Sequence, residues 1–398
     1  MPYDAYLGDF RLPSSGTGVV PRAYAPRCGV LVPLSTEIGL ARPVGWACQD
    51  SSMGETKKLH HYVPQAYLRG FATEKERVTA IKLPGDTEPF TTIVRNVAAQ
   101  NHFHRIEGLD QPDKFEDVLS EIEGAALTVI RKLEAGAKLP LSEADRWTLA
   151  YFISLQAVRG PDTRRTIEMI QRQMVRLEVG AGGRKNIAAW AKKNLGFEPN
   201  EAQAQRLWNE ATRVGGPPIT LSNWAHIQHM MEMALEMLPY ITARPWTLVS
   251  FTNRSLITGD SPVTLIRDAK DAPHDGVGFA TAWGIAFPLT RKLGLLMSDP
   301  MVAIENLSPD DPRIGKIWDA VSKGQADHRE VGTTAMEKLF NEHTALNASE
   351  YLYRHPDDAR FVPKDLHGPQ LVNVSMSGAD MQFTGAPWFG LDSEEAVI

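Results

Sequence analysis

Apolar residues recur every three or four positions through most of the chain between residues 113 and 238, and Gly and Pro interrupt the pattern at intervals. This period places the apolar side chains on one face of a helix, so several helices must pack together to bury them. Ser142 and Pro161 are typical of helix starts, and Gly136 follows a helix end. The pattern predicts helices over residues 113–135, 142–158, 161–179, 185–195, 200–213 and 220–238.

Strand-like segments flank this helical block. Before it, residues 78–83 and 90–94 are separated by the turn residues Pro84 to Glu88, which predicts a hairpin. After Pro239 we expect short strands at 246–251, 255–258, 263–266, 283–287 and 293–297, then helices at 309–322 and 330–347 and an edge strand from Glu350 to Tyr353. The expected fold is α+β: a mainly helical body with an N-terminal β-hairpin and a small C-terminal sheet.

The two ends of the chain differ from this body. Residues 1–53 hold many Pro and Gly, no Lys and both cysteines, and they lack a lasting apolar period. We expect either a disordered leader or a start codon assigned too far upstream, with Met53 as the natural start. Residues 54–355 are expected to form a single α+β domain, and residues 356–398 a loosely ordered tail.

Composition excludes several classes of protein. Charged residues make up 23% of the 398 residues, and the net charge of -6 weighs against long nucleic acid as a partner. The sequence has no apolar run long enough for a membrane span, and its acidic start is unlike a signal peptide. Cys28 and Cys48 alone cannot make a disulfide framework or a four-thiolate zinc site. We therefore expect a cytoplasmic protein that has no membrane partner.

Four short motifs share a resemblance. They are His60 to Phe71, Ile122-Glu123, Leu155 to Arg159 and Thr258 to Val263. Together they resemble a bacterial family that carries a domain of unknown function and opens with His-His-Tyr-Val-Pro-Gln, over about residues 57–355. Gly259 stands where Ser is more usual in that family. The resemblance implies a shared fold and a shared polar cluster, but it implies no reaction.

The motif residues suggest a candidate site. Neighbouring residues of a strand face opposite sides, so at most one of His60 and His61 is expected in the site, as a base or a ligand. Gln156 and Arg159 share a helix face, and Arg159 can steady an anion. We expect His60, His61, Gln156 and Arg159 to be catalytic, and Glu123 and Asp260 to bind a divalent metal, all around one cavity.

Structural roles compete with each of these assignments. Glu123 and Arg159 can instead form a buried salt bridge between two helices. Asp260 can accept nearby backbone N–H groups in a turn. A histidine can bond the backbone ahead of Pro64.

Two further histidine pairs have ligand-like spacing. They are His102 with His104, if that segment is extended, and His226 with His229 on a helix. Neither pair has a third ligand at a diagnostic distance, and the sequence contains no Gly-rich phosphate loop or Gly-x-Ser-x-Gly elbow.

Two functions stay open. The first is a hydrolase, a metal-dependent nuclease or other phosphoesterase, which would take a divalent metal and an anionic or phosphate-containing ligand. The second is a non-catalytic binding or regulatory module, in which the polar cluster only organises the helices.

Overall fold

A computed structural model describes residues 59–268, 276–374 and 381–387, so the expected leader at residues 1–53 lies outside the described residues. The fold is α+β, as the sequence predicts. Its longer helices are α2 (Phe115–Glu134), α3 (Glu143–Val158), α4 (Pro161–Gly182), α6 (Glu201–Thr212), α7 (Asn223–Thr242) and α9 (Thr334–Asn347). The shorter ones are α1 (Gln65–Leu68), α5 (Ile187–Leu195) and α8 (Arg313–Ser322).

The largest sheet has five strands in the order β10-β5-β9-β8-β7. Its strands are β5 (Trp246–Ser250), β7 (Thr264–Ile266), β8 (Gly284–Thr290), β9 (Leu293–Ser298) and β10 (His328–Val331). The β10–β5 pair is parallel and the other pairs are antiparallel. Every residue of β8 is buried, which explains why the sequence of this strand shows an apolar run rather than an alternation.

A second sheet has four antiparallel strands in the order β3-β2-β11-β6. They are β2 (Arg77–Lys82), β3 (Phe90–Ile93), β6 (Thr258–Gly259) and β11 (Tyr351–Arg354). The hairpin predicted over residues 78–94 is confirmed by the pairing of β2 with β3. A separate two-stranded ribbon pairs β1 (Leu59–His61) with β4 (Ala99–Asn101).

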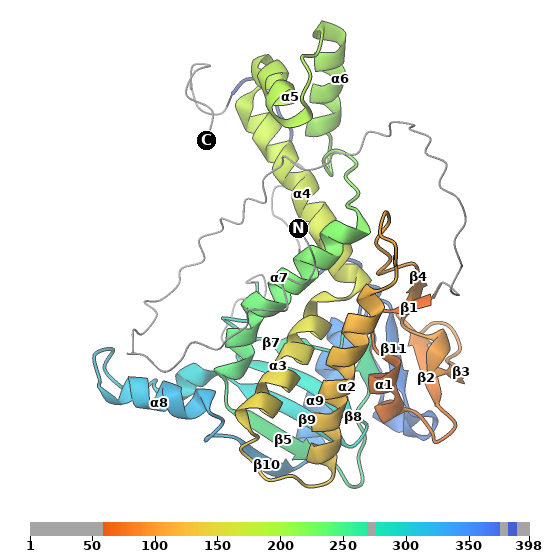
Figure 1. Cartoon of the computed structure of the whole chain (residues 1–398), viewed down its shortest axis with the longest axis vertical. Helices are drawn as coiled ribbons and strands as arrows, with labels where there is room; N and C mark the ends of the chain where they lie inside the picture. Colours follow the sequence, from red (N-terminus) through yellow and green to blue (C-terminus); the bar gives the residue numbers. More distant parts are fainter. Residues whose placement is uncertain (1–58, 269–275, 375–380, 388–398) are drawn as a thin grey trace.

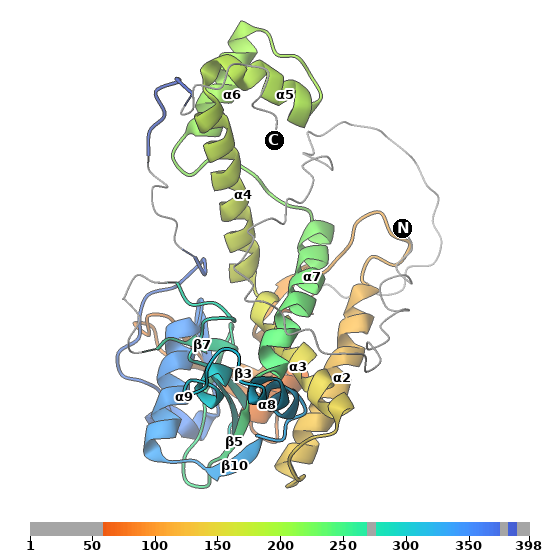
Figure 2. The same ribbon diagram turned by 90° about the vertical axis from the view of Figure 1, so that its left-hand side faces the viewer.

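Helix α3 lies at the centre of the body. It packs against α7 on one side and α2 on the other, and Figure 1 shows these three helices side by side in front of the five-stranded sheet. Figure 2 shows the same layer of helices from the side. Leu149, Phe152 and Ile153 of α3 belong to the main hydrophobic core, together with Phe287 of β8. Ser142 caps α3 by accepting a hydrogen bond from the Asp145 N–H.

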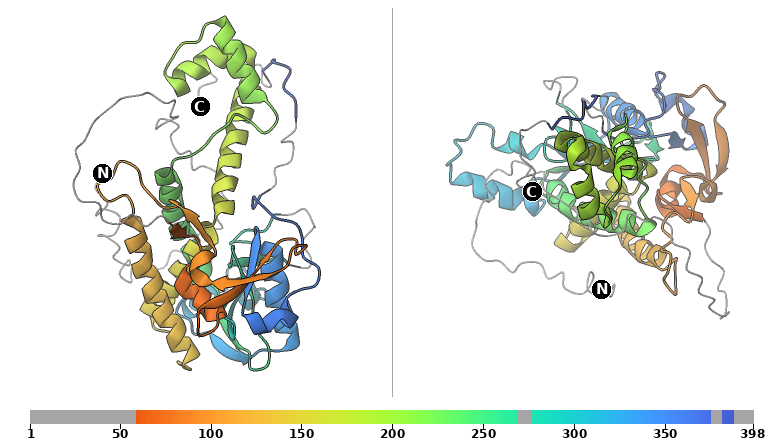
Figure 3. Two further views of the ribbon diagram at one scale, coloured as in Figure 1. Left: turned by 90° about the vertical axis from the view of Figure 1, so that its right-hand side faces the viewer. Right: turned by 90° about the horizontal axis from the view of Figure 1, so that it is seen from above.

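The outer half of α4 carries α5 and α6 away from the sheets, as Figures 1 and 3 show. This helical head, residues 175–212, has a hydrophobic cluster of its own, formed by Val175, Val179, Ile187, Ala204, Trp208 and Ala211. No residue of this cluster belongs to the main core.

Some expected elements differ from the observed ones. Only Thr258 of the strand expected at 255–258 lies in a strand, and α8 begins at Arg313 rather than at 309. The segment from Glu350 to Tyr353 is no edge strand, because β11 lies between β2 and β6 with Leu352 and Tyr353 buried. Helix α7 continues past Pro239 to Thr242, since burial of Leu238 and Ile241 outweighs the backbone hydrogen bond that proline removes. The start of the helix expected at 330–347 is strand β10, and α9 begins only after its cap, Thr333.

The described part of the expected loose tail contacts the body. The Gln370 N–H donates to the Ser349 carbonyl at 2.8 Å, and the Asn373 N–H donates to the Thr166 hydroxyl at 2.8 Å. Among the described helices, none is long and apolar enough to span a membrane.

Candidate metal centre

The two histidines of the opening motif lie on β1 and, as predicted, they serve different surroundings. His61 uses both ring nitrogens in structural contacts: Nε2 donates to the Arg95 carbonyl at 3.0 Å, and Nδ1 accepts from the Gln65 amide at 3.4 Å. Burial lowers the pKa of His61, so the ring is neutral near pH 7. These contacts support a structural role for His61 rather than the catalytic role expected of it.

The predicted approach of Glu123 and Arg159 is confirmed. A guanidinium nitrogen of Arg159 lies 2.6 Å from Oε1 of Glu123, and the other terminal nitrogen donates to the His61 carbonyl at 2.6 Å. The ion pair ties α2 to α3, and the second bond ties both helices to β1. Because both terminal nitrogens of Arg159 are occupied and its side chain is only 2% exposed, these contacts favour the structural alternative for this pair.

Asp260 and Gln156 are also buried. Asp260 accepts three backbone N–H groups from Ser349, Glu350 and Tyr351 at 2.7 to 3.0 Å, which fixes the start of β11. Burial raises the pKa of this carboxyl to about 7, and the nearby Asp162 adds to the rise. The side-chain amide of Gln156 has no hydrogen-bond partner within the described residues.

One group of side chains in the described part of the chain could hold a metal ion: His60, His104 and Glu116. Each offers a ligand atom, and the three atoms lie within 4.8 Å of one another. The metal ligands expected from the sequence, Glu123 and Asp260, are not in this group, because each is engaged by the donors described above.

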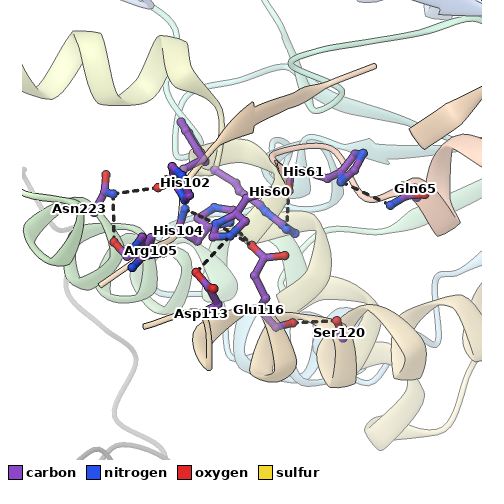
Figure 4. A network of polar contacts seen from close by, with 12 residues as sticks. His60, His61, Gln65, His102, His104, Arg105, Asp113, Glu116, Ser120 and Asn223 are labelled. Carbon is purple, nitrogen blue, oxygen red and sulfur yellow. Dashed lines mark hydrogen bonds and ion pairs between the residues drawn. The ribbon is translucent and has the colours of Figure 1, made fainter. Parts of the chain in front are cut away.

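Three separate segments bring the group together, as Figure 4 shows. His60 comes from β1, His104 from the loop after β4, and Glu116 from the first turn of α2. The pairing of His60 with Gln100 across the β1–β4 ribbon brings the loop onto β1. The His104 N–H then donates to Nδ1 of His60 at 2.8 Å, and the two rings stack with centroids 6.0 Å apart.

The contact with Glu116 defines which ring nitrogen of His104 carries the proton. Nδ1 of His104 lies 2.5 Å from Oε1 of Glu116, and a carboxylate can only accept, so Nδ1 carries the proton. The pKa of His104 is well below its ordinary value, because the ring is buried and because Arg159 and Arg164 lie nearby. The ring is therefore neutral, and Nε2 presents a lone pair. His60 differs, because its Nδ1 already accepts the His104 N–H, so a cation held by His60 would displace that bond.

Several buried polar atoms around this group lack partners within the described residues: Nε2 of His104, Nδ1 of His102 and Oδ1 of Asp113. Oδ1 of Asp113 lies 3.4 Å from Nε2 of His60. A buried polar atom without a partner costs about 1 to 3 kcal/mol, and a bound ion or water is a common reason for one. Neither Asp113 nor Glu116 forms an ion pair with Lys or Arg among the described residues, so their charge is available to a cation.

The other histidine pair noted in the sequence does not form such a group. Nε2 of His226 lies 3.3 Å from Glu168 of α4, and burial lowers the pKa of His226 to about 4. The condition stated for His102 and His104, an extended segment, is not met, since His102 has a φ of 58°.

Comparison with known proteins places the chain in a family. It belongs to DUF4238, a family of proteins of unknown function, whose model matches residues 59–358. No curated protein and no solved structure matches the chain. The matched residues include all of the candidate metal centre.

Proposed function

We propose that this protein is a metal-dependent hydrolase whose divalent cation is held by His60, His104 and Glu116. The observation that carries the proposal is the approach of three ligand atoms to within 4.8 Å of one another, from three separate segments. Two imidazoles and one carboxylate are the protein ligands of many hydrolytic zinc sites, which leave further positions for water and substrate. Such a cation supplies a nucleophile at neutral pH by lowering the pKa of bound water.

The side chains around the group support this chemistry. Glu116 accepts the Nδ1 proton of His104 and so fixes the tautomer and orientation of that ring. Asp113 lies beside His60 with an unpartnered oxygen, where it can take up a proton or add a ligand.

The substrate class that we propose is a phosphoester. Arg105 follows His104 in the sequence, and Lys114 lies between Asp113 and Glu116. Lys114 is exposed and Arg105 partly so, and these two positive charges beside the group in the sequence support an anionic substrate. Arg159, the residue expected for this role from the sequence, is already paired with Glu123.

The direct test is hydrolysis of bis(p-nitrophenyl) phosphate by the full chain with Zn²⁺, Mn²⁺ or Mg²⁺. His104→Ala and Glu116→Gln should each lower the rate at least about a hundredfold, the scale expected for a residue that takes part in the chemistry. His229→Ala, a substitution of the same type on α7, should leave the rate unchanged. Equal rates in all four proteins would contradict the proposal.

One observation favours a second function, a non-catalytic module with a structural metal. Both imidazole rings have no exposed surface, and Asp113 could complete a shell of four protein ligands. A closed shell of this kind stabilises a fold and leaves no position for substrate. Under this alternative, a chelator would lower the melting temperature sharply, and the wild-type protein would bind metal without hydrolysing any phosphoester.

A further inference from the structure

The loop that carries His104 adopts a backbone conformation that needs support. His102 has a φ of 58°, in the left-handed region that residues other than Gly enter infrequently, although His does so more often than most. Residues held there cost of order 1 to 3 kcal/mol and persist only where surrounding contacts fix them. The loop has no strand partner at this point. Its backbone supplies one bond across the turn, from the Arg105 N–H to the His102 carbonyl at 3.2 Å, and side chains add the others.

Asn223, the first residue of α7, provides two of them. Its Nδ2 donates to the His102 carbonyl at 2.9 Å and to the Arg105 carbonyl at 3.0 Å. These carbonyls lie on either side of His104 along the chain, so one amide group holds the loop at both ends, as Figure 4 shows.

Arg164, on the first turns of α4, completes the arrangement. Its Nη1 donates to Oδ1 of Asn223 at 2.9 Å, and its Nη2 donates to the Phe103 carbonyl at 2.7 Å. The guanidinium also lies 3.5 Å from the centre of the Phe103 ring. Both polar atoms of the Asn223 side chain are therefore used. Arg164 donates to its oxygen, and its nitrogen donates to two carbonyls, so the orientation of the amide is fixed.

We propose that Asn223 is a positioning residue of the metal centre, acting on His104 through the loop. This inference rests on the proposed metal site. The His104 N–H that bonds His60 and the His104 ring that meets Glu116 both move with this loop. Loss of the two Asn223 bonds lets the loop relax from its left-handed conformation and separates the three ligand groups.

The test compares Asn223→Asp with a matched control. Aspartate keeps the acceptor for Arg164 but loses both donors and faces two carbonyls with a charge. Asn347 offers the control, because its Nδ2 also donates to two carbonyls, those of Ser261 at 2.7 Å and Val263 at 3.0 Å, and it is not part of the metal group. The readouts are the affinity of the full chain for Co²⁺, the visible absorption spectrum of bound Co²⁺, and the melting temperature.

Asn223→Asp should weaken Co²⁺ binding about 10- to 100-fold, the usual effect of removing a group that orients a ligand, and should alter the spectrum. Asn347→Asp should lower the melting temperature by a similar amount and leave affinity and spectrum unchanged. If Asn223→Asp does not fold, Asn223→Ala tests the same contacts, since alanine removes both bonds to the loop carbonyls without adding a charge.

The possible failures differ. Wild-type affinity and spectrum in Asn223→Asp would overturn this inference alone. An equal loss of affinity in both aspartate variants would also overturn it, because the effect would then be general destabilisation. A wild-type protein that binds no Co²⁺ would overturn the proposed function and this inference together, whereas Co²⁺ binding without hydrolysis would contradict only the hydrolase activity.

Discussion

The ion pair between Glu123 and Arg159 shows how single residues stabilise this body. Both side chains are shielded, with 17% of Glu123 and 2% of Arg159 exposed. Glu123→Ala should therefore destabilise the protein by about 3 kcal/mol, because it leaves a buried guanidinium without its counter-charge. Urea unfolding measures the effect. Glu76→Ala, which breaks a pair with Arg69 in which both side chains are about half exposed, should cost less than about 1 kcal/mol. Equal losses in the two variants would contradict the argument.

At the same scale, the sequence revealed only part of the candidate site. The opening motif identified His60, and the ligand-like spacing of His102 and His104 was visible. The grouping of these residues could not be found from their spacing. Glu116 follows His104 by 12 positions, and His60 precedes His104 by 44, and neither separation is typical of a metal site. The β1–β4 pairing that joins them involves three residues on each strand, too few to leave a pattern in the sequence.

Helices were predicted best, because the spacing of their apolar residues repeats over several turns. The start of α3 was predicted from its Ser142 cap and the start of α4 from Pro161, since both signals act locally. The place of β11 was not predictable in this way. Its four residues pair with β2, far earlier in the chain, and two of them, Leu352 and Tyr353, also pair with β6. Such partners depend on how the helices between them pack.

Asp260 joins β6 to β11, and its pKa makes that connection depend on pH. Burial raises the pKa from 3.8 to about 7, so the folded protein holds a proton that the unfolded chain releases. The stability contributed by the protonated form is present below about pH 4 and is lost as the pH rises to about 7. In urea unfolding at pH values across this range, the wild type should lose stability more steeply than Asp260→Asn, which cannot titrate. Parallel curves for the two proteins would contradict the assignment.

On the scale of the whole molecule, the body and the helical head have separate hydrophobic cores. The head cluster of residues 175–212 centres on Trp208, which is 7% exposed, and truncation of a buried Trp costs about 3 to 5 kcal/mol. Because the two cores share no residue, this cost should fall mainly on the head. Trp208→Ala should therefore remove the hydrogen-exchange protection of α5 and α6 while α3 and β8 keep theirs.

The control for this prediction is Trp224→Ala, a change of the same size on α7, where the side chain is 43% exposed. Less apolar surface is lost there, so protection should change little in either part. The metal group lies in the body, on β1, α2 and the loop after β4. Trp208→Ala should accordingly keep its affinity for Co²⁺. If Trp208→Ala lowers the hydrogen-exchange protection of α3 together with that of α6, the head and the body unfold as one cooperative unit. That result would contradict the prediction that the head unfolds by itself.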